Sequence, residues 1–183
     1  MPTQRYLSRQ AQLLSLIREA EVDALLVTGV SNVRYLTGFS GDSSALLIGP
    51  SVRVLISDSR YQTQIVEECP GLEADIRTQK TKPHDQLAAA IAKARPGKLA
   101  IESHILTVHE LGKVKEAIEK TDAGKAIEFK PLAETVEKLR QIKDDEEIAE
   151  TRLAIRIAER AFVAMKATLT DDLTERQVAH ELE

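Results

Sequence analysis

Short apolar runs alternate with amphipathic segments through the first 130 residues of the chain. Residues 5–20 carry apolar side chains at spacings of four, three and three, which places them on one face of a helix. Those side chains are Leu7, Ala11, Leu14 and Ile17. The run from Asp23 to Thr28 is short and mostly apolar, as in a buried strand, and Gly29 ends it. We therefore expect a helix and then a buried strand at the start of the fold.

Two further strand-like runs, residues 44–48 and 52–56, are separated only by Gly49-Pro50-Ser51. A connection this short predicts an antiparallel hairpin. Beyond it, the pattern predicts helices and strands in alternation, over residues 60–68, 73–77, 83–94, 98–102, 107–120 and 126–129. The second of these runs is expected to be an edge strand. Strands that alternate with helices, together with one hairpin, predict an α/β fold in which a mixed β-sheet is flanked by helices.

Polar residues and glycines indicate where some of the helices begin and end. Ser31 can cap a short helix over residues 31–36, because its side-chain oxygen can accept from the free amides of the first turn. Gly38 fits the end of that helix. Asp58 or Ser59 is the expected cap of the next helix.

The pattern changes after Pro131. Residues 132–142 are predicted to be helical, and the acidic run 144–147 follows them. Acidic side chains suit a helix start, where the free amides and the helix dipole make the end positive. Asp144 and Glu147 also have the spacing of a capping box.

The helix that begins at this acidic run reaches about Leu169 and carries a broad apolar face, which needs a large partner surface. Residues 174–183 start another helix that has no stop signal. We therefore expect one domain over residues 1–130. Residues 131–183 would then be a linker and the opening helices of a second, truncated domain.

The amino-acid composition limits the kinds of partner that this chain is expected to bind. The chain has 183 residues, a formal charge of −4 at pH 7, no tryptophan and only three tyrosines and three phenylalanines. Its basic residues are scattered and its aromatic residues are few, so we expect no nucleic-acid partner. No apolar run approaches the roughly 20 residues that span a bilayer, so we expect no membrane partner either. The single cysteine, Cys69, and a polar N-terminus without a signal segment predict a cytoplasmic protein.

Motifs of several other chemistries are missing from the sequence. It contains no His-Glu-x-x-His zinc motif, no Gly-x-Ser-x-Gly nucleophile elbow and no glycine-rich phosphate motif. Glu102, His104 and His109 make a weak candidate metal site, because the two histidines are five apart rather than three or four. Cys69 follows two acidic residues, which disfavour a reactive thiolate. The residues alone therefore indicate no catalytic residue and no metal ligand in this chain.

Three segments carry a resemblance to a known family: SNVRYLTGFSGDSS at residues 31–44, SDSRY at residues 57–61 and LRQIKDDEEI at residues 139–148. In this order the chain resembles the N-terminal domain of the creatinase and proline-peptidase family, the pita-bread metallopeptidases. It is most similar to proline dipeptidases (prolidases) and Xaa-Pro aminopeptidases.

The resemblance implies the N-terminal, non-catalytic domain of a proline-specific hydrolase, with the first helices of the catalytic domain attached. In the family, two divalent metal ions (manganese, cobalt or zinc) are bound by two Asp, one His and two Glu of the C-terminal domain. None of these ligands can be carried onto this sequence, so the chain alone is expected to be inactive. The resemblance also implies a homodimer whose N-terminal domains shape the neighbouring subunit's active site, and proline-containing peptides as the substrate of the parent enzyme.

By its position, the loop Phe39–Ser43 would be the one that reaches the neighbouring active site, with Asp42 pairing with the substrate's ammonium group. Phe39, Arg34 and Tyr35 are the further candidates for contacting the substrate. The alternative is structural: Arg34 holds the short helix, Tyr35 packs in the core, and Asp42 forms a turn beside Gly41. For the whole protein, the alternatives are an interaction module without catalysis and a hydrolase of another small substrate, as creatinase is.

Overall fold

The computed structural model describes residues 4–121, 127–170 and 172–182. Contacts divide the chain into two units, Met1–Gln141 and Ile142–Glu183. A six-stranded sheet forms the centre of the first unit, in the order β4-β3-β2-β1-β5-β6. Its strands are β1 (Ala24–Val27), β2 (Ala45–Gly49), β3 (Val52–Asp58), β4 (Glu73–Arg77), β5 (Lys98–Glu102) and β6 (Glu128–Leu132). The predicted first residue of the last strand, Ala126, lies outside the described residues.

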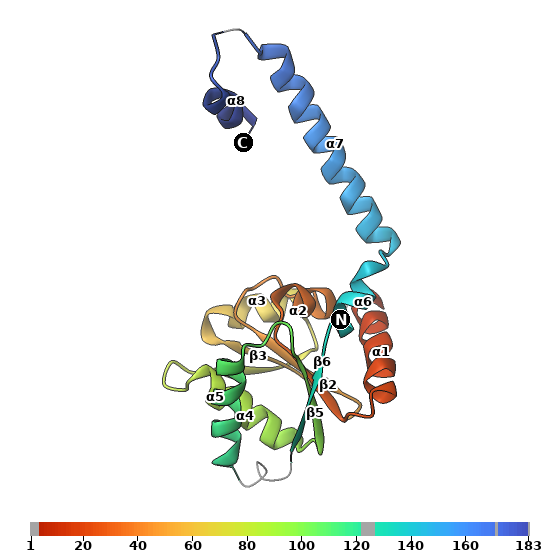
Figure 1. Cartoon of the computed structure of the whole chain (residues 1–183), viewed down its shortest axis with the longest axis vertical. Coiled ribbons are helices and arrows are strands. Elements are labelled where there is room, and N and C mark those ends of the chain that lie inside the picture. The colour runs from red at the N-terminus through yellow and green to blue at the C-terminus, as the bar shows by residue number, and fades with distance from the viewer. Residues whose placement is uncertain (1–3, 122–126, 171, 183) are drawn as a thin grey trace. The chain divides into compact units, whose positions relative to one another are not determined.

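The directions of the strands determine at which edge of the sheet their carboxyl ends lie. β2 runs antiparallel to both of its neighbours, whereas the pairs β1–β5, β3–β4 and β5–β6 are parallel. The predicted hairpin is confirmed, with Ala45 opposite Ile56 and Gly49 opposite Val52. The predicted edge strand is also confirmed, as β4. Because every strand except β2 points the same way, their carboxyl ends meet at one edge of the sheet (Figure 1).

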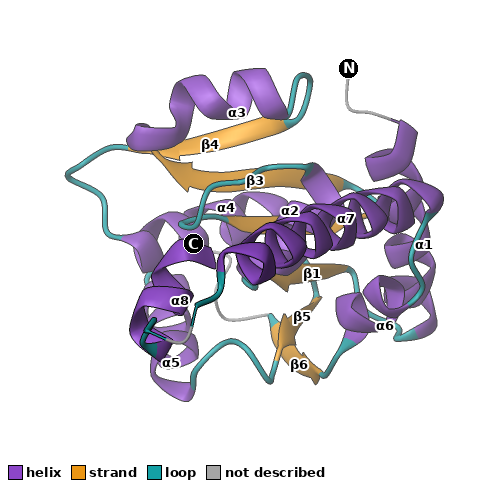
Figure 2. Cartoon of the chain, turned by 90° about the horizontal axis from the view of Figure 1, so that it is seen from above, coloured by secondary structure: helices purple, strands orange, loops and turns teal. Residues whose placement is uncertain are grey.

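Helices cover both faces of this sheet, as the sequence pattern predicted. One face is packed by α1 (Gln4–Glu19), α2 (Val30–Thr37), α3 (Gln62–Glu68) and α6 (Thr135–Gln141). The other face is packed by α4 (Pro83–Ala94) and α5 (Val108–Glu119). A 3-10 turn, η1 (Ser59–Tyr61), leads from β3 into α3. Figure 2 shows α4 and α5 on one side of the strands and α1 and α6 on the other.

The central strand β1 contributes to both layers. Leu25 and Val27 pack in the cluster that contains Leu13 of α1. Leu26 packs in the opposite cluster, beside Ile91 of α4. Complete burial of such a side chain contributes about 1.5–3 kcal/mol, so a run that is apolar at successive positions favours a strand covered on both faces.

The start of α2 differs from the prediction. The helix begins at Val30 and its N-cap is Gly29, which has no side chain to accept a hydrogen bond, so the expected cap at Ser31 is wrong. The acceptor at this end comes instead from β5, since the Glu102 carboxylate accepts from the amide of Gly29 at 2.8 Å. The other end is as predicted: Gly38 has φ 83° and donates its N–H to the carbonyl of Arg34.

The second unit contains α7 (Asp145–Thr168) and α8 (Glu175–Leu182). The predicted capping box is confirmed, because Asp144 Oδ1 accepts from Glu147 N at 2.9 Å and Glu147 Oε2 accepts from Asp144 N at 3.1 Å. Several large apolar side chains of α7 are exposed, namely Leu153, Ile155, Ile157, Phe162 and Val163. None of the helices in the described part of the chain is long and apolar enough to cross a membrane.

Candidate functional site

A cleft of about 550 Å³ lies where the carboxyl ends of the strands meet. Its walls come from the first residues of β2, the ends of β3 and β4, and the first turns of α4 and α5. The charged and titratable side chains around it include Asp42, Asp58, Arg77, His84, His109 and Lys113. Open α/β sheets bind their ligands at this edge, so the cleft is the natural candidate site of the first unit.

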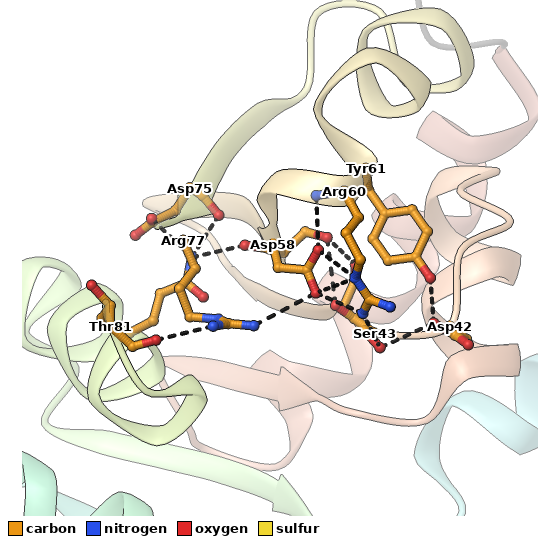
Figure 3. Close-up of polar contacts among 11 residues, drawn as sticks. Asp42, Ser43, Asp58, Arg60, Tyr61, Asp75, Arg77 and Thr81 are labelled. Atoms are coloured by element: carbon orange, nitrogen blue, oxygen red, sulfur yellow. Dashed lines mark hydrogen bonds and ion pairs between the residues drawn. The ribbon is translucent and has the colours of Figure 1, made fainter. Parts of the chain in front are cut away.

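Asp42 is an exposed carboxylate at the rim of this cleft. Its Oδ1 accepts a hydrogen bond from the hydroxyl of Tyr61 and another, at 3.0 Å, from Ser43 Oγ (Figure 3). These bonds hold the pKa of Asp42 below its usual value, with the Tyr61 hydrogen bond as the largest cause. The same bond raises the pKa of Tyr61. Asp42 is therefore ionised near neutral pH while Tyr61 keeps its proton.

The loop that carries Asp42 is anchored at its other end by α3. The Glu68 carboxylate accepts from both the backbone N–H and the hydroxyl of Ser40, each at 2.7 Å. Gln64 donates to the Ser40 hydroxyl at 2.8 Å. Directly before Ser40, the Phe39 ring is fully buried and packs edge-to-face on Tyr61, with the ring centres 5.4 Å apart. The loop is thus fixed by packing as well as by hydrogen bonds.

Asp58 at the end of β3 joins two arginines. Its carboxylate accepts from Nε and Nη2 of Arg60, at distances of 2.7 to 3.1 Å, and lies 3.5 Å from Nη2 of Arg77. The Arg60 hydrogen bonds hold the pKa of Asp58 below its usual value, although burial acts in the opposite direction. Arg77 also donates to the carbonyl of Thr81 at 3.0 Å (Figure 3). The expected cap at Asp58 is confirmed, because its Oδ1 also accepts from the backbone N–H of Arg60 at 2.9 Å. The network joins the ends of β3 and β4.

A second polar network closes the edge of the sheet between β1 and β5. Glu102 is buried, and its Oε2 accepts from the amides of Thr28 and Gly29 at 2.6 and 2.8 Å. Its Oε1 accepts from Nδ2 of Asn32 at 2.6 Å, and the same nitrogen donates to Oε1 of Glu137 at 2.6 Å. In doubly wound sheets, ligands bind at the topological switch point, where the order of the strands reverses. Here the protein's own Glu102 carboxylate occupies that position.

The four predicted substrate contacts lie in different environments. Arg34 is exposed on α2. Tyr35 is buried, with its hydroxyl donating to the carbonyl of Leu139 at 3.3 Å, and Phe39 is buried beneath the loop. Of the four, Asp42 alone lines the cleft. That these side chains contact a substrate stays a prediction.

The weak candidate metal site does not assemble. Glu102 accepts from backbone amides, while Nε2 of His104 lies 3.0 Å from Oε1 of Glu137. Within the described ranges, no three His, Cys, Asp or Glu side chains come together as possible metal ligands. Cys69 is buried, and burial raises the pKa of its thiol to about 11, which agrees with the expectation that it is not a nucleophile.

Two features of this site were missed from the sequence. The sequence predicted no polar contact for Tyr61, whereas its hydroxyl donates to Asp42. A signal for that contact was present, because the hairpin pairs Ala45 with Ile56 and so brings residues just before β2 next to residues just after β3. The Glu68 anchor of Ser40 had no such signal, since it depends on how α3 packs.

Comparisons with known proteins agree with this fold. A family model described as the Creatinase/Prolidase N-terminal domain matches residues 9–142. The chain is 31% identical over 172 residues to the uncharacterized peptidase YqhT of Bacillus subtilis, which covers 94% of this chain and 46% of YqhT. The chain therefore spans about half the length of the curated relatives it matches.

Solved structures show the same relationship. An Xaa-Pro dipeptidase from Bacillus anthracis is similar with a TM-score of 0.86 and 30% identity, over 97% of this chain and 48% of that one. The N-terminal domain of the cytoplasmic peptidase PepQ from Mycobacterium tuberculosis is similar with a TM-score of 0.65 and 38% identity, over 73% of this chain and 98% of that one.

Proposed function

Since this chain belongs to the Creatinase/Prolidase N-terminal domain family, we propose that it is the substrate-positioning part of an Xaa-Pro peptidase. Its relatives include an Xaa-Pro dipeptidase, and the parent reaction would be hydrolysis of the peptide bond before proline. The observation that supports this role most directly is the ionised Asp42 at the rim of the cleft. A carboxylate in that place suits the ammonium group of a peptide.

The chemistry of bond cleavage is not assigned to these residues. The family resemblance implies two divalent metal ions, manganese, cobalt or zinc, which would activate the attacking water. The described part of the chain brings no three potential ligands together, so the residues do not fit that group. The role proposed for this chain is therefore to bind and orient the peptide, in a cytoplasmic homodimer whose partner subunit carries out the cleavage.

The test uses the protein at its natural length and an Xaa-Pro dipeptide. Asp42→Asn removes the charge with little change of shape, and we expect KM to rise roughly two- to fivefold with a smaller change in kcat, as for the loss of one exposed ion pair. Asp85→Asn, on the exposed start of α4, is the matched control and is expected to leave KM unchanged. A wild-type protein that does not cleave Xaa-Pro peptides, or an Asp42→Asn variant with the wild-type KM, would refute the proposal.

A further inference from the structure

We infer that Tyr61 is a positioning residue: its hydroxyl fixes one carboxylate oxygen of Asp42 and leaves the other to receive a peptide's ammonium group. The inference rests on the proposed function for its ligand, but the contact between the two side chains can be tested without any ligand. Tyr61 itself would touch no substrate. It would act only through the orientation of Asp42.

The hydrogen bonds distinguish the two carboxylate oxygens of Asp42. The bonds from Tyr61 and Ser43 both fall on Oδ1 of Asp42. Among the residues that the structure describes, no other side chain donates a hydrogen bond to Oδ2. Arg60, the cation whose charge acts on Asp42, donates to Asp58 through both Nε and Nη2. Oδ2 is thus the oxygen that can pair with an incoming ammonium group.

The position of the Tyr61 hydroxyl is set by packing behind its ring. The ring lies edge-to-face against the fully buried Phe39, at an interplanar angle of 88°. Gly41 lies over the same pair, and a Cβ there would come within 2.3 Å of the Phe39 ring and 2.9 Å of the Tyr61 ring. A ring held on these sides has little freedom to swing, so its hydroxyl is aimed at Asp42 before any ligand arrives.

The start of the loop is held from the helix that follows Tyr61. Glu68 of α3 accepts twice from Ser40, and Gln64 of the same helix donates to the Ser40 hydroxyl. The Ser40 and Asp42 contacts therefore both come from the segment 61–68. A loop ordered in advance loses less conformational entropy when a ligand binds, which raises affinity.

Charge state supports the same arrangement. The pKa of Asp42 is lowered and the pKa of Tyr61 is raised, each chiefly by the hydrogen bond between them. A protonated hydroxyl therefore donates to an ionised carboxylate throughout the neutral range. Ser43, Arg60 and the backbone amide of Asp42 itself also lower the pKa of the Asp42 carboxyl, whereas desolvation acts in the opposite direction.

The first experiment measures the pKa of Asp42 by carbon-13 NMR of its side-chain carboxyl in the 183-residue chain. Tyr61→Phe keeps the ring that packs on Phe39 and removes only the hydroxyl, so the fold should survive. We expect the pKa of Asp42 to rise toward the ordinary aspartate value, because its main hydrogen-bond donor is lost. Tyr6→Phe, the same change on α1, should leave it where it was. An Asp42 pKa that is equal in Tyr61→Phe and wild type would overturn the inference.

The second experiment measures affinity in the protein at its natural length, for one Xaa-Pro dipeptide with a free amino terminus and for its N-acetylated form. Tyr61→Phe is expected to weaken binding of the free peptide roughly two- to threefold, less than Asp42→Asn does, because the lost hydrogen bond orients the carboxylate and is not made to the peptide itself. Binding of the acetylated peptide should change little. Ser43→Ala removes the other donor to Oδ1 and should act in the same direction, more weakly.

The outcomes separate the two ideas. If Tyr61→Phe loses the same affinity for the free and the acetylated peptide, the substitution affects the fold in general, and the positioning role is overturned. If the pKa of Asp42 rises in Tyr61→Phe but Asp42→Asn binds both peptides as wild type does, the contact is real and the proposed function fails. If Asp42→Asn weakens binding of the free peptide but Tyr61→Phe changes neither the pKa nor the affinity, the proposed function stands and Tyr61 has no part in it.

Discussion

Glu102→Gln tests whether the carboxylate between β1 and β5 holds α2 in place. The substitution keeps the size of the side chain but replaces one acceptor oxygen with an NH2 group. If the NH2 takes the place of Oε2, it faces the amides of Thr28 and Gly29. If it takes the place of Oε1, it faces the side-chain amide of Asn32. In either orientation, the new NH2 group faces hydrogen-bond donors and leaves them without an acceptor. Water cannot replace the lost acceptor readily, because the side chain at this position is only 2% exposed.

The magnitude follows from the count of lost acceptors. A buried donor without an acceptor costs about 1–3 kcal/mol, and hydrogen bonds to a charged acceptor are about twice as strong as neutral ones. Part of that loss in the free energy of unfolding is offset, because a neutral amide is less costly to bury than a carboxylate. We therefore expect Glu102→Gln to lower the free energy of unfolding by about 2–3 kcal/mol.

Urea unfolding followed by tyrosine fluorescence measures this change in the right part of the protein. The chain has no tryptophan, and its three tyrosines, Tyr6, Tyr35 and Tyr61, all lie in the first unit, so the signal does not report on α7 or α8. With a slope of about 2 kcal/mol per molar urea, the midpoint should fall by roughly 1–1.5 M.

The matched control is Glu116→Gln on α5, which removes an exposed ion pair with Lys113 at 3.3 Å. It should change the free energy of unfolding by less than about 0.5 kcal/mol. If the midpoint of Glu102→Gln equals that of this control, the buried carboxylate does not stabilise the sheet edge and the reasoning is refuted.

Two further predictions concern the cleft rim. Gly41→Ala places a Cβ 2.3 Å from the buried Phe39 ring, so we expect a loss of about 1–3 kcal/mol in urea unfolding, and a variant as stable as wild type would contradict the packing described for the loop. Asp58 has a pKa below its unfolded value, so its ion pair should stabilise the fold above that value and lose this contribution as pH falls through the folded pKa. Urea midpoints measured from pH 7 downward should therefore drop less steeply in the acid range for Asp58→Asn than for wild type, and parallel curves would exclude the effect.

Elements defined by local spacing were predictable from the sequence, and contacts between distant elements were not. The apolar periodicity of residues 83–94 and 98–102 predicted α4 and β5 with the bounds that the structure has. The pairing of Asn32 with Glu102 joins residues 70 apart and depends on the register between β1 and β5, which no local pattern contains. The wrong cap at Ser31 has the same origin, because the acceptor at this helix start comes from β5.

The candidate site was predictable to the same extent. Its location in the loop after α2 followed from the motif at residues 31–44, and Asp42 does line a cleft. Phe39 stands in a polar, glycine-flanked loop whose composition indicates exposure, and yet its ring is fully buried. The ring packs in the core cluster on this face of the sheet and against Tyr61, whose position requires the hairpin and η1 together.

The spacing of these contacts along the chain also bears on the order in which the protein assembles. The loop that carries Asp42 is held by contacts between residues close in the sequence. The contact of Asp42 with Tyr61 spans 19 residues, and that of Ser40 with Glu68 spans 28. The network around Asn32 spans 70 residues to Glu102 and 105 to Glu137. Closing a longer loop costs more entropy, and nonlocal contacts form later. During synthesis from the N-terminus, we therefore expect the hairpin and the loop that carries Asp42 to form while β5 and α6 are still to be made. Asp42 would then be in place before Glu102 and Glu137 hold α2, the helix that leads into this loop.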